Sequence, residues 1–154
     1  MITYALENVD DVFDAYALGV LMQYHNEAVQ DGVRHFDLNN VEQYRRIQKT
    51  GQLRLMVARQ DGMAIGFCTC FVSRSNQHAE LVGQIDMIFV RPDRRTRMIG
   101  LDLVTRLIAQ LRSEGVTLFR GMSSAKINSE PLWRWLGFER VGTIYERSCP
   151  AIMN

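Results

Sequence analysis

The feature that most constrains this chain is an arginine-rich turn between an apolar segment and a long amphipathic one. Glu80–Val90 reads ELVGQIDMIFV and is followed at once by RPDRRTRMIG. Pro92 cannot continue a strand, because it has no backbone N–H to donate. From Ile99 onward apolar residues recur at helical spacing, which predicts a helix over Thr96–Glu114. The order strand, turn, helix therefore predicts an α/β fold.

The rest of the chain reads as short strands and helices separated by turn residues. The predicted strands are Ile2–Glu7, Leu53–Arg59, Met63–Ser73, Glu80–Val90, Val116–Met122 and Val141–Arg147. The predicted helices are Val12–Val29 (capped by Asp10 or Asp11), Val41–Lys49 (capped by Asn39 or Asn40), Thr96–Glu114, and one that begins at Asn128 or Ser129 and runs through Leu136. This order predicts a mixed central sheet with helices on both faces, in one domain spanning residues 1–154.

Composition limits the kind of partner this chain can bind. The 154 residues include 18 basic and 17 acidic ones, a formal net charge of +1, so the chain as a whole is not a polyanion binder. Any anion site must therefore come from local clustering. A nucleic-acid interface built on the arginine-rich turn is disfavoured, because no aromatic residues are interleaved with the basic ones.

Cysteine and histidine usage argues against disulfide and metal sites. Cys68 and Cys70 lie two apart in an apolar run, so on a strand both side chains face the same way. With Cys149 they make an odd number without a framework spacing, which favours buried thiols in a reducing compartment. No histidine pair has the spacing of a metal site, so no metal is expected.

The N-terminal residues and the hydropathy pattern favour a cytoplasmic protein. The first residues, MITYALENVDDVFD, are acidic and lack the apolar stretch of a signal peptide. No segment approaches the ~20 apolar residues that a membrane helix needs. We therefore expect a cytoplasmic location without a membrane partner, or release from the cytoplasm as part of a particle.

The arginine-rich turn has two interpretations from its residues alone. A helix N-terminus exposes unpaired N–H groups and the positive end of the helix dipole. Arg95 and Arg97 beside it would make phosphate or pyrophosphate a natural ligand. The alternative is a solvated basic loop, which is common on protein surfaces.

Two local motifs resemble those of the GNAT N-acetyltransferases. The stretch FVRPDRRTRMIGLDLV is similar to the family's Val-x-Pro-x-x-Arg-Gly-x-Gly-x-Gly/Ala motif, with Val90, Pro92, Arg95 and Gly100 in register. The run PLWRWLGF resembles the family's Leu-Tyr-x-x-Leu-Gly-Phe element. The residues that fit this second element are Asn128, Leu132, Leu136, Gly137 and Phe138. The order of predicted elements also agrees with the family over most of the chain, and the short C-terminal end is loosely similar to phage-encoded members.

The resemblance implies a site for acetyl-CoA. The turn from Arg95 to Gly100 would wrap the coenzyme A pyrophosphate with its backbone N–H groups, and the strand end at Ile88–Val90 would pair with the pantetheine arm as an added strand does. Asn128 would lie near the same arm. The implied cofactor-binding residues are Ile88, Phe89, Val90, Arg95, Thr96, Arg97, Met98, Ile99, Gly100 and Asn128.

Asp86 is the candidate catalytic base. It lies on the predicted central strand, where it alternates with Gln84 and Ile88, and the acetyl thioester would lie beside it. Burial among apolar neighbours would disfavour its charged form and suit it to take a proton from an ammonium group. Glu80 is an alternative base, and a structural role in accepting a backbone or arginine hydrogen bond is an alternative for Asp86.

Three residues depart from the family pattern. Thr96 and Met98 stand where the family has glycines, which let the backbone approach phosphate closely. Trp133 stands where many members have a tyrosine that protonates the leaving thiolate, and an indole cannot serve as that acid. Tyr145 is another phenol near the C-terminus, but a core or interface role is favoured for it.

The sequence thus predicts an N-acetyltransferase that moves an acetyl group from acetyl-CoA to a primary amine by direct attack in a ternary complex. The acceptor is an amine-bearing small molecule or a protein amine. The alternative is a GNAT-like module that has lost its chemistry and acts as a structural or protein-interaction component, including in a phage particle. A homodimer or a larger assembly is left open.

Overall fold

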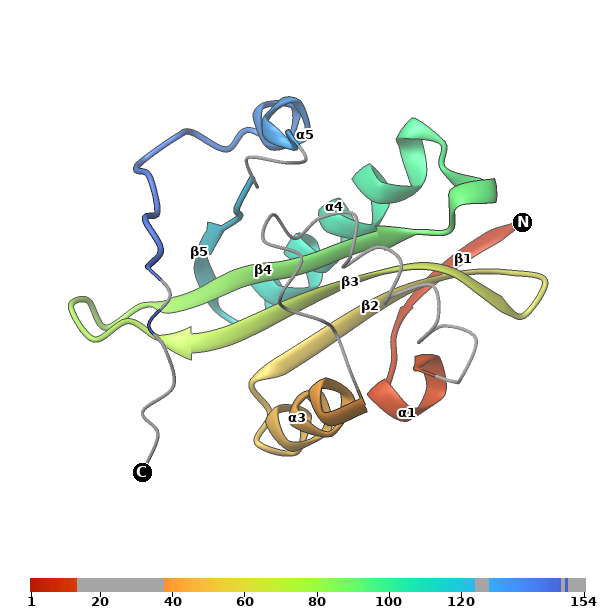
Figure 1. Ribbon diagram of the computed structural model, residues 1–154, viewed down its shortest axis with the longest axis horizontal. Coiled ribbons are helices and arrows are strands. Elements are labelled where there is room, and N and C mark those ends of the chain that lie inside the picture. Colours follow the sequence, from red (N-terminus) through yellow and green to blue (C-terminus); the bar gives the residue numbers. More distant parts are fainter. Residues whose placement is uncertain (14–37, 124–127, 148, 150–154) are drawn as a thin grey trace.

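A computed structural model describes residues 1–13, 38–123, 128–147 and 149 of the chain (Figure 1). Its elements follow one another in the order β1 (Ile2–Leu6), α1 (Val9–Val12), α3 (Leu38–Lys49), β2 (Leu53–Gln60), β3 (Met63–Arg74), β4 (Leu81–Val90), the 3-10 turn η1 (Pro92–Arg94), α4 (Arg97–Ser113), β5 (Val116–Arg120) and α5 (Glu130–Trp135). None of these helices is both long and apolar enough to cross a membrane.

The five strands form one mixed sheet in the order β1-β2-β3-β4-β5. The first four strands are antiparallel neighbours, and β4 and β5 are parallel. The β2–β3 hairpin turns at Asp61-Gly62, where both residues have positive φ angles of 52° and 80°. A two-residue turn of this kind matches the twist of the strands, and the Asp-Gly pair predicted it.

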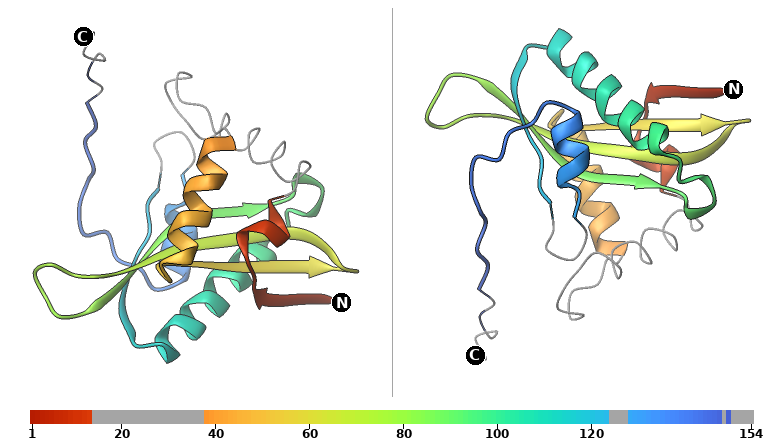
Figure 2. Two further views of the ribbon diagram at one scale, coloured as in Figure 1. Left: turned by 90° about the horizontal axis from the view of Figure 1, so that it is seen from below. Right: turned by 90° about the horizontal axis from the view of Figure 1, so that it is seen from above.

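Helices cover both faces of the sheet, as the sequence predicts (Figure 2). On the α4 face, Leu103, Leu107 and Leu111 of α4 are fully buried against the sheet, because their four-residue spacing puts them on one side of the helix. On the α3 face, Val9 of α1 and Val41 of α3 pack against aromatic side chains of β3 and β4. The chain therefore has the α/β architecture expected from its pattern of elements.

A β-bulge interrupts the pairing of β3 with β4. Cys68 pairs with Ile88 and Cys70 pairs with Ile85, so two residues of β4, Asp86 and Met87, lie opposite Thr69 alone. The extra residue reverses the alternation of side chains along β4. Ile88 consequently packs on the α4 face, whereas Asp86 reaches the α3 face, and the prediction that these two residues share one face is wrong.

The N-terminal helices differ from prediction at their starts. Helix α1 begins at Val9, after Asn8, so neither Asp10 nor Asp11 caps it. Helix α3 begins at Leu38 instead of Val41, which places residues 39 and 40 inside the helix. The helix predicted over Val12–Val29 lies outside the described residues from position 14 onward.

The strand predicted over Val141–Arg147 is absent. In the structure these residues are exposed and have no strand pairing. A strand needs a neighbour to bond, and the described part of the chain offers this segment none.

Candidate functional site

The turn between β4 and α4 holds its arginines in different ways. Arg91 is paired with Asp93, its Nε lying 3.1 Å from Oδ1. Arg94 lies 3.6 Å from the same carboxylate and donates to Gln60 Oε1 at 3.3 Å, away from the helix start. Arg95 instead donates from Nε to the carbonyl oxygen of Val90 at 3.1 Å. Arg95 is therefore held against the end of β4, next to the first turn of α4.

The first turn of α4 leaves its backbone donors available to a ligand. Thr96 is the N-cap with extended backbone angles (φ −105°, ψ 153°), and its hydroxyl makes no capping hydrogen bond. The first N–H groups of a helix have no acceptor within the helix. With the positive end of the helix dipole, they form a site that suits a phosphate group.

Thr96 and Met98, which stand where the family motif has glycines, do not distort this turn. Among the described residues, Asp61 is the one non-glycine residue with a positive φ, so Thr96 and Met98 adopt backbone angles open to any residue. The Met98 side chain is 58% exposed. Gly100 faces β4, and a Cβ there would lie 3.9 Å from Ile88 and Val90, an ordinary contact distance. The turn thus forms with ordinary backbone angles at Thr96 and Met98, the two positions where the family motif has glycines.

The last residues of β4 lie beyond its parallel partner. The register of β4 with β5 runs from Leu81 opposite Val116 to Gln84 opposite Arg120 and stops there, while β4 continues to Val90. Ile88–Val90 therefore pairs with β3 on one side and, among the described strands, with none on the other. This open edge leads directly into η1 and the start of α4.

Asp86 lies at the centre of a hydrogen-bonded group on the α3 face. The Tyr44 hydroxyl donates to Asp86 Oδ2, and the Thr69 hydroxyl lies 3.3 Å from the same oxygen. Thr69 is fully buried and its Oγ1 also accepts the Met87 N–H at 3.0 Å. Asp86 itself is exposed, so the expectation that apolar neighbours bury it is wrong. The bulge explains this, because it turns the carboxylate out toward α3.

Burial sets the protonation of the neighbouring groups. Desolvation, reinforced by the Asp86 carboxylate, raises the pKa of Tyr44 well above its ordinary value, so its hydroxyl stays a donor to Asp86. Burial also raises the pKa of Cys70 to about 12 and that of the fully buried Cys68 well above the usual range. Neither thiol is therefore a nucleophile at neutral pH.

The α5 residues singled out in the sequence serve structural contacts. Trp133 is buried, and its Nε1 donates to Met122 O at 3.2 Å and to Ser129 Oγ at 3.1 Å. Its ring also lies so close to Gly121 that a Cβ there would be 2.5 Å away. Asn128 Oδ1 accepts the Glu130 N–H at 3.0 Å and so helps start α5. Tyr145 is 90% exposed, which leaves it outside any enclosed site.

A comparison with protein families decides the relationship that the motifs suggested. The sequence profile described as Acetyltransferase (GNAT) domain matches residues 23–149, which is most of the chain. The chain belongs to the GNAT acetyltransferase family. A search of curated proteins gave no match.

Solved structures share the GNAT fold along the whole chain. A GCN5-related N-acetyltransferase from Ralstonia eutropha superposes with a TM-score of 0.76 at 16% identity, covering 96% of this chain and 99% of that one. The ribosomal-protein-alanine N-acetyltransferase from Brucella melitensis gives 0.74 at 15% identity, covering 97% and 99%. A predicted acetyltransferase with acetyl-CoA from Clostridium acetobutylicum gives 0.71 at 13%, covering 96% of each chain. At these identities the likeness shows the fold alone.

Tyr44 and Thr69 are the site residues that sequence reasoning missed. Thr69 stands between two cysteines, with Phe67 and Phe71 on its own face of β3. A hydroxyl in that apolar row signals that a buried donor must be satisfied there. Tyr44 is three residues after the buried Val41, so it falls on the inner side of α3. The sequence spacing could have placed Tyr44 and Thr69 on the inner side of their elements. That both hydroxyls reach Asp86 depends on the bulge.

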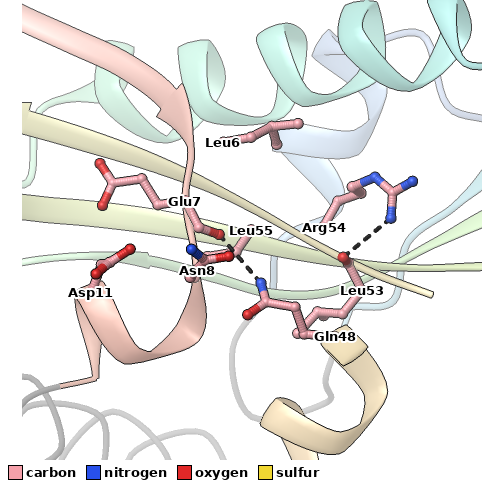
Figure 3. A pocket seen from close by; sticks show the side chains of 8 residues that line it. All are labelled: Leu6, Glu7, Asn8, Asp11, Gln48, Leu53, Arg54 and Leu55. Atoms are coloured by element: carbon pink, nitrogen blue, oxygen red, sulfur yellow. Dashed lines mark hydrogen bonds between the residues drawn. The ribbon is translucent and has the colours of Figure 1, made fainter. Parts of the chain in front are cut away.

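A separate hollow of about 400 Å³ lies where β1, α1, α3 and β2 meet (Figure 3). Gln48 from α3 crosses it to donate to Glu7 O at 3.3 Å, and its Oε1 accepts the Val9 N–H at 2.9 Å. None of the predicted site residues lines this hollow, and neither does Glu80. In the described part of the chain, no group of His, Cys, Asp or Glu is arranged to hold a metal ion.

Proposed function

We propose that this GNAT-family protein transfers an acetyl group from acetyl-CoA to a primary amine by direct attack in a ternary complex. The observation that carries the proposal is the open edge of β4 at Ile88–Val90, which runs straight into the free first turn of α4. An extended pantetheine arm can add to such an edge through backbone hydrogen bonds. The pyrophosphate would then reach the helix N–H groups at the end of that edge.

The turn residues would hold the two ends of coenzyme A. The backbone N–H groups of Arg97, Met98, Ile99 and Gly100 would face the pyrophosphate, and the Arg95 guanidinium would add charge. The Thr96 N–H donates to Arg94 O at 2.8 Å, so Thr96 would contribute its hydroxyl. The exposed Met98 side chain supports this fit, because it need not occupy the space of the pyrophosphate. Asn128, whose oxygen is engaged at α5, would offer its amide N–H₂ to the pantetheine.

Asp86 would act as the base. The thioester would lie beside the bulge, where β4 has run past the end of its pairing with β5, so that an N–H on this open edge could polarise its carbonyl. The amine nitrogen attacks the carbonyl carbon, the C–N bond forms and the C–S bond breaks. The amine proton passes to Asp86, directly or through water. The thiolate leaves with the C–S electron pair and takes a proton from solvent.

The neighbours of Asp86 would keep its carboxylate in place. Tyr44 and Thr69 both donate to Oδ2, which leaves Oδ1 free of these two donors for the amine. Because Asp86 is exposed on the α3 face, the acceptor would enter from that side. A small-molecule amine and a protein N-terminus both fit this chemistry, and the relative from Brucella melitensis is named for a protein alanine.

A second candidate function follows from Trp133. Its indole is committed to packing and to two hydrogen bonds, so α5 supplies no phenol to protonate the thiolate. A protein that binds acetyl-CoA without turnover, and acts as a structural or protein-interaction module, would tolerate this change. The cytoplasmic location, the phage connection and the single-domain boundary of 1–154 stay predictions.

The test is acetyl-CoA-dependent release of free thiol across a panel of primary amines. Arg95→Ala is expected to weaken acetyl-CoA binding at least ~10-fold, because a guanidinium–phosphate contact is lost. Arg94→Ala removes the same charge from a side chain that points to Gln60, and should leave binding unchanged. Binding without thiol release would favour the second candidate function, and equal effects of the two substitutions would overturn the placement of the pyrophosphate.

A further inference from the structure

Strand β5 places Arg120 on the same face of the sheet as Asp86. Phe119 packs into the cluster on the α4 face, and a Cβ on Gly83 would lie 2.9 Å from its ring, so both residues belong to that face. Side chains alternate along a strand, which turns the next residues, Arg120 and Gln84, to the α3 face. Arg120 is the register partner of Gln84 on β5. Asp86 is two residues beyond Gln84 on β4 and therefore lies on that face too.

Arg120 and Asp86 start close together on this face. Strands are ~4.8 Å apart and each residue advances ~3.3 Å, so one strand spacing and two residues separate the two α-carbons by about 8 Å. Arg120 is exposed, and in the described part of the chain the paired carboxylates have other partners. A guanidinium without a carboxylate partner, so near a carboxylate that would receive an ammonium group, suits a second charge on the same small molecule.

The opposite side of Asp86 is closed by aromatic rings. Tyr44 donates its hydroxyl to the carboxylate, and its ring stacks on Phe71 of β3 with the two centroids 5.9 Å apart. Thr69, the other donor to Asp86, is fully buried. Toward β5, by contrast, the side chain of Arg120 is exposed. An acceptor whose amine reaches Asp86 would therefore extend over β5 and not over β3.

We propose that the acceptor is a small amine that also carries an anionic group, a carboxylate or a phosphate, and that Arg120 binds this group while Asp86 receives the amine proton. A guanidinium offers two parallel N–H donors, which match the oxygens of either anion. It would also repel an acceptor with a second positive charge, such as a diamine. This inference names the acceptor class of the proposed acetyl transfer and rests on it.

The test compares pairs of amines that differ in charge but little in size. β-Alanine is set against 3-aminopropanol, and phosphoethanolamine against ethanolamine, with acetyl-CoA-dependent thiol release as the readout. The anionic member of at least one pair should have a kcat/KM at least ~10-fold higher, as expected for one charged hydrogen-bonded contact. The pair with the larger ratio distinguishes a carboxylate from a phosphate. Equal values within both pairs would overturn the inference.

Substitutions at Arg120 separate recognition of the anion from a structural role. Arg120→Gln should bring the ratio within each pair close to one, and Arg120→Glu should make 1,3-diaminopropane a better acceptor than β-alanine. Arg112→Gln removes an exposed arginine from the last turn of α4 and should keep the wild-type ratio. A loss of folded protein lowers every rate alike and cannot reverse a preference. A ratio that survives Arg120→Gln would contradict the assignment.

A titration keeps the failure of this inference apart from the failure of acetyl transfer. β-Alanine and phosphoethanolamine are titrated calorimetrically into the full chain with excess coenzyme A, in wild type and in Arg120→Gln. Binding of either that needs Arg120, in a protein without turnover, would retain the anion site and overturn the acetyl transfer. Turnover of neutral and anionic amines at equal rates would retain the transfer and overturn the anion site. Neither turnover nor binding would overturn both.

Discussion

The two faces of the sheet are built from different chemistry. On the α4 face, aliphatic side chains of the helix pack against aliphatic side chains and thiols of the strands, joined by the Trp133 indole of α5. Among the described residues, no buried member of this cluster carries a hydroxyl. On the α3 face, aromatic rings meet in edge and stacked contacts, such as Phe13 on Phe67 at 5.3 Å and Tyr44 on Phe71 at 5.9 Å. That face also holds the Asp86 group, with Thr69 buried among the rings.

The difference separates what stabilises the protein from what would perform its chemistry. The stability of the α4 face depends on how completely its side chains fill the space between helix and sheet. A truncation that leaves a cavity there lowers the free energy of unfolding. The α3 face depends on hydrogen bonds whose loss leaves polar groups unsatisfied. Substitutions on the two faces should therefore affect different measurements, stability on one and turnover on the other.

The largest effect is expected from Leu107→Ala on the α4 face. Leu107 is fully buried at the centre of α4, so the truncation should lower the free energy of unfolding by about 3 kcal/mol. Chemical denaturation checks the value. Met98→Ala on the same helix is the control and should stay within about 0.5 kcal/mol, because Met98 is 58% exposed. If Leu107→Ala and Met98→Ala lowered the free energy of unfolding by similar amounts, burial against the sheet would not explain the stability of α4.

The next effect concerns Asp86→Asn on the α3 face. The amide keeps the size and accepts the Tyr44 hydrogen bond, but it cannot take a proton. Turnover should fall about 100-fold, equivalent to ~2.7 kcal/mol of transition-state stabilisation, with acetyl-CoA affinity unchanged. Steady-state kinetics and a binding titration measure the two quantities. Unchanged turnover across a pH series would remove Asp86 from the mechanism.

Thr69→Val should affect both measurements, because Thr69 links the fold to the Asp86 group. Valine preserves the shape but leaves the Met87 N–H, in a half-buried part of β4, without its acceptor, which should cost about 2 kcal/mol of stability. Turnover should also fall, since Asp86 loses one of its two donors. Thr69→Ser keeps the hydroxyl, costs ~0.8 kcal/mol for one methyl group, and should retain turnover. Loss of turnover in the serine variant as well would assign Thr69 to packing alone.

The smallest expected effect is a pH dependence of stability due to Glu114. This residue is the C-cap of α4 and pairs with Arg54 of β2. Arg54 donates to Glu114 Oε2 at 3.0 and 2.8 Å, and these hydrogen bonds lower the pKa of Glu114. Stability from a lowered carboxyl pKa is present above the unfolded value of ~4.3 and is lost as pH falls through the folded value. Wild type should thus exceed Glu114→Gln by about 0.5 kcal/mol at pH 7, with the gap closing toward pH 3.

A gap that widens on acidification would contradict this sign. Unfolding curves of both proteins at matched ionic strength provide the comparison, because surface pairs are screened by salt. Because Glu114 lies at the end of α4, away from the Asp86 group, Glu114→Gln should leave turnover unchanged.

The elements with a clear period were predictable from the sequence, and the α4 face follows from them. Leu103, Leu107 and Leu111 recur every four residues, so their helix and its buried side were predicted together. The Asp61-Gly62 turn fixed the β2–β3 hairpin in the same way. The family motif added the order of β4, turn and α4, which the structure bears out.

The chemistry of the α3 face was less predictable, because it depends on contacts between distant segments. Strict alternation put Asp86 on the same face as Ile88, and only the pairing with β3 reveals the bulge that separates them. Tyr44 and Thr69 are 42 and 17 residues away from Asp86 in the sequence. Local periodicity carries no information about such contacts. The strand predicted over Val141–Arg147 is wrong for a related reason, because a strand pattern does not identify the strand with which it would pair.

The central claim is that the open β4 edge and the start of α4 bind acetyl-CoA. Its most direct test is a calorimetric titration of the full chain with acetyl-CoA, with ATP as a phosphate-bearing control. We predict saturable one-to-one binding of acetyl-CoA and a lower affinity for Arg95→Ala. At a hundredfold excess over the dissociation constant, acetyl-CoA should also raise the free energy of unfolding by ~2.7 kcal/mol. ATP should give neither. No heat with acetyl-CoA, or equal binding of ATP, would contradict the account.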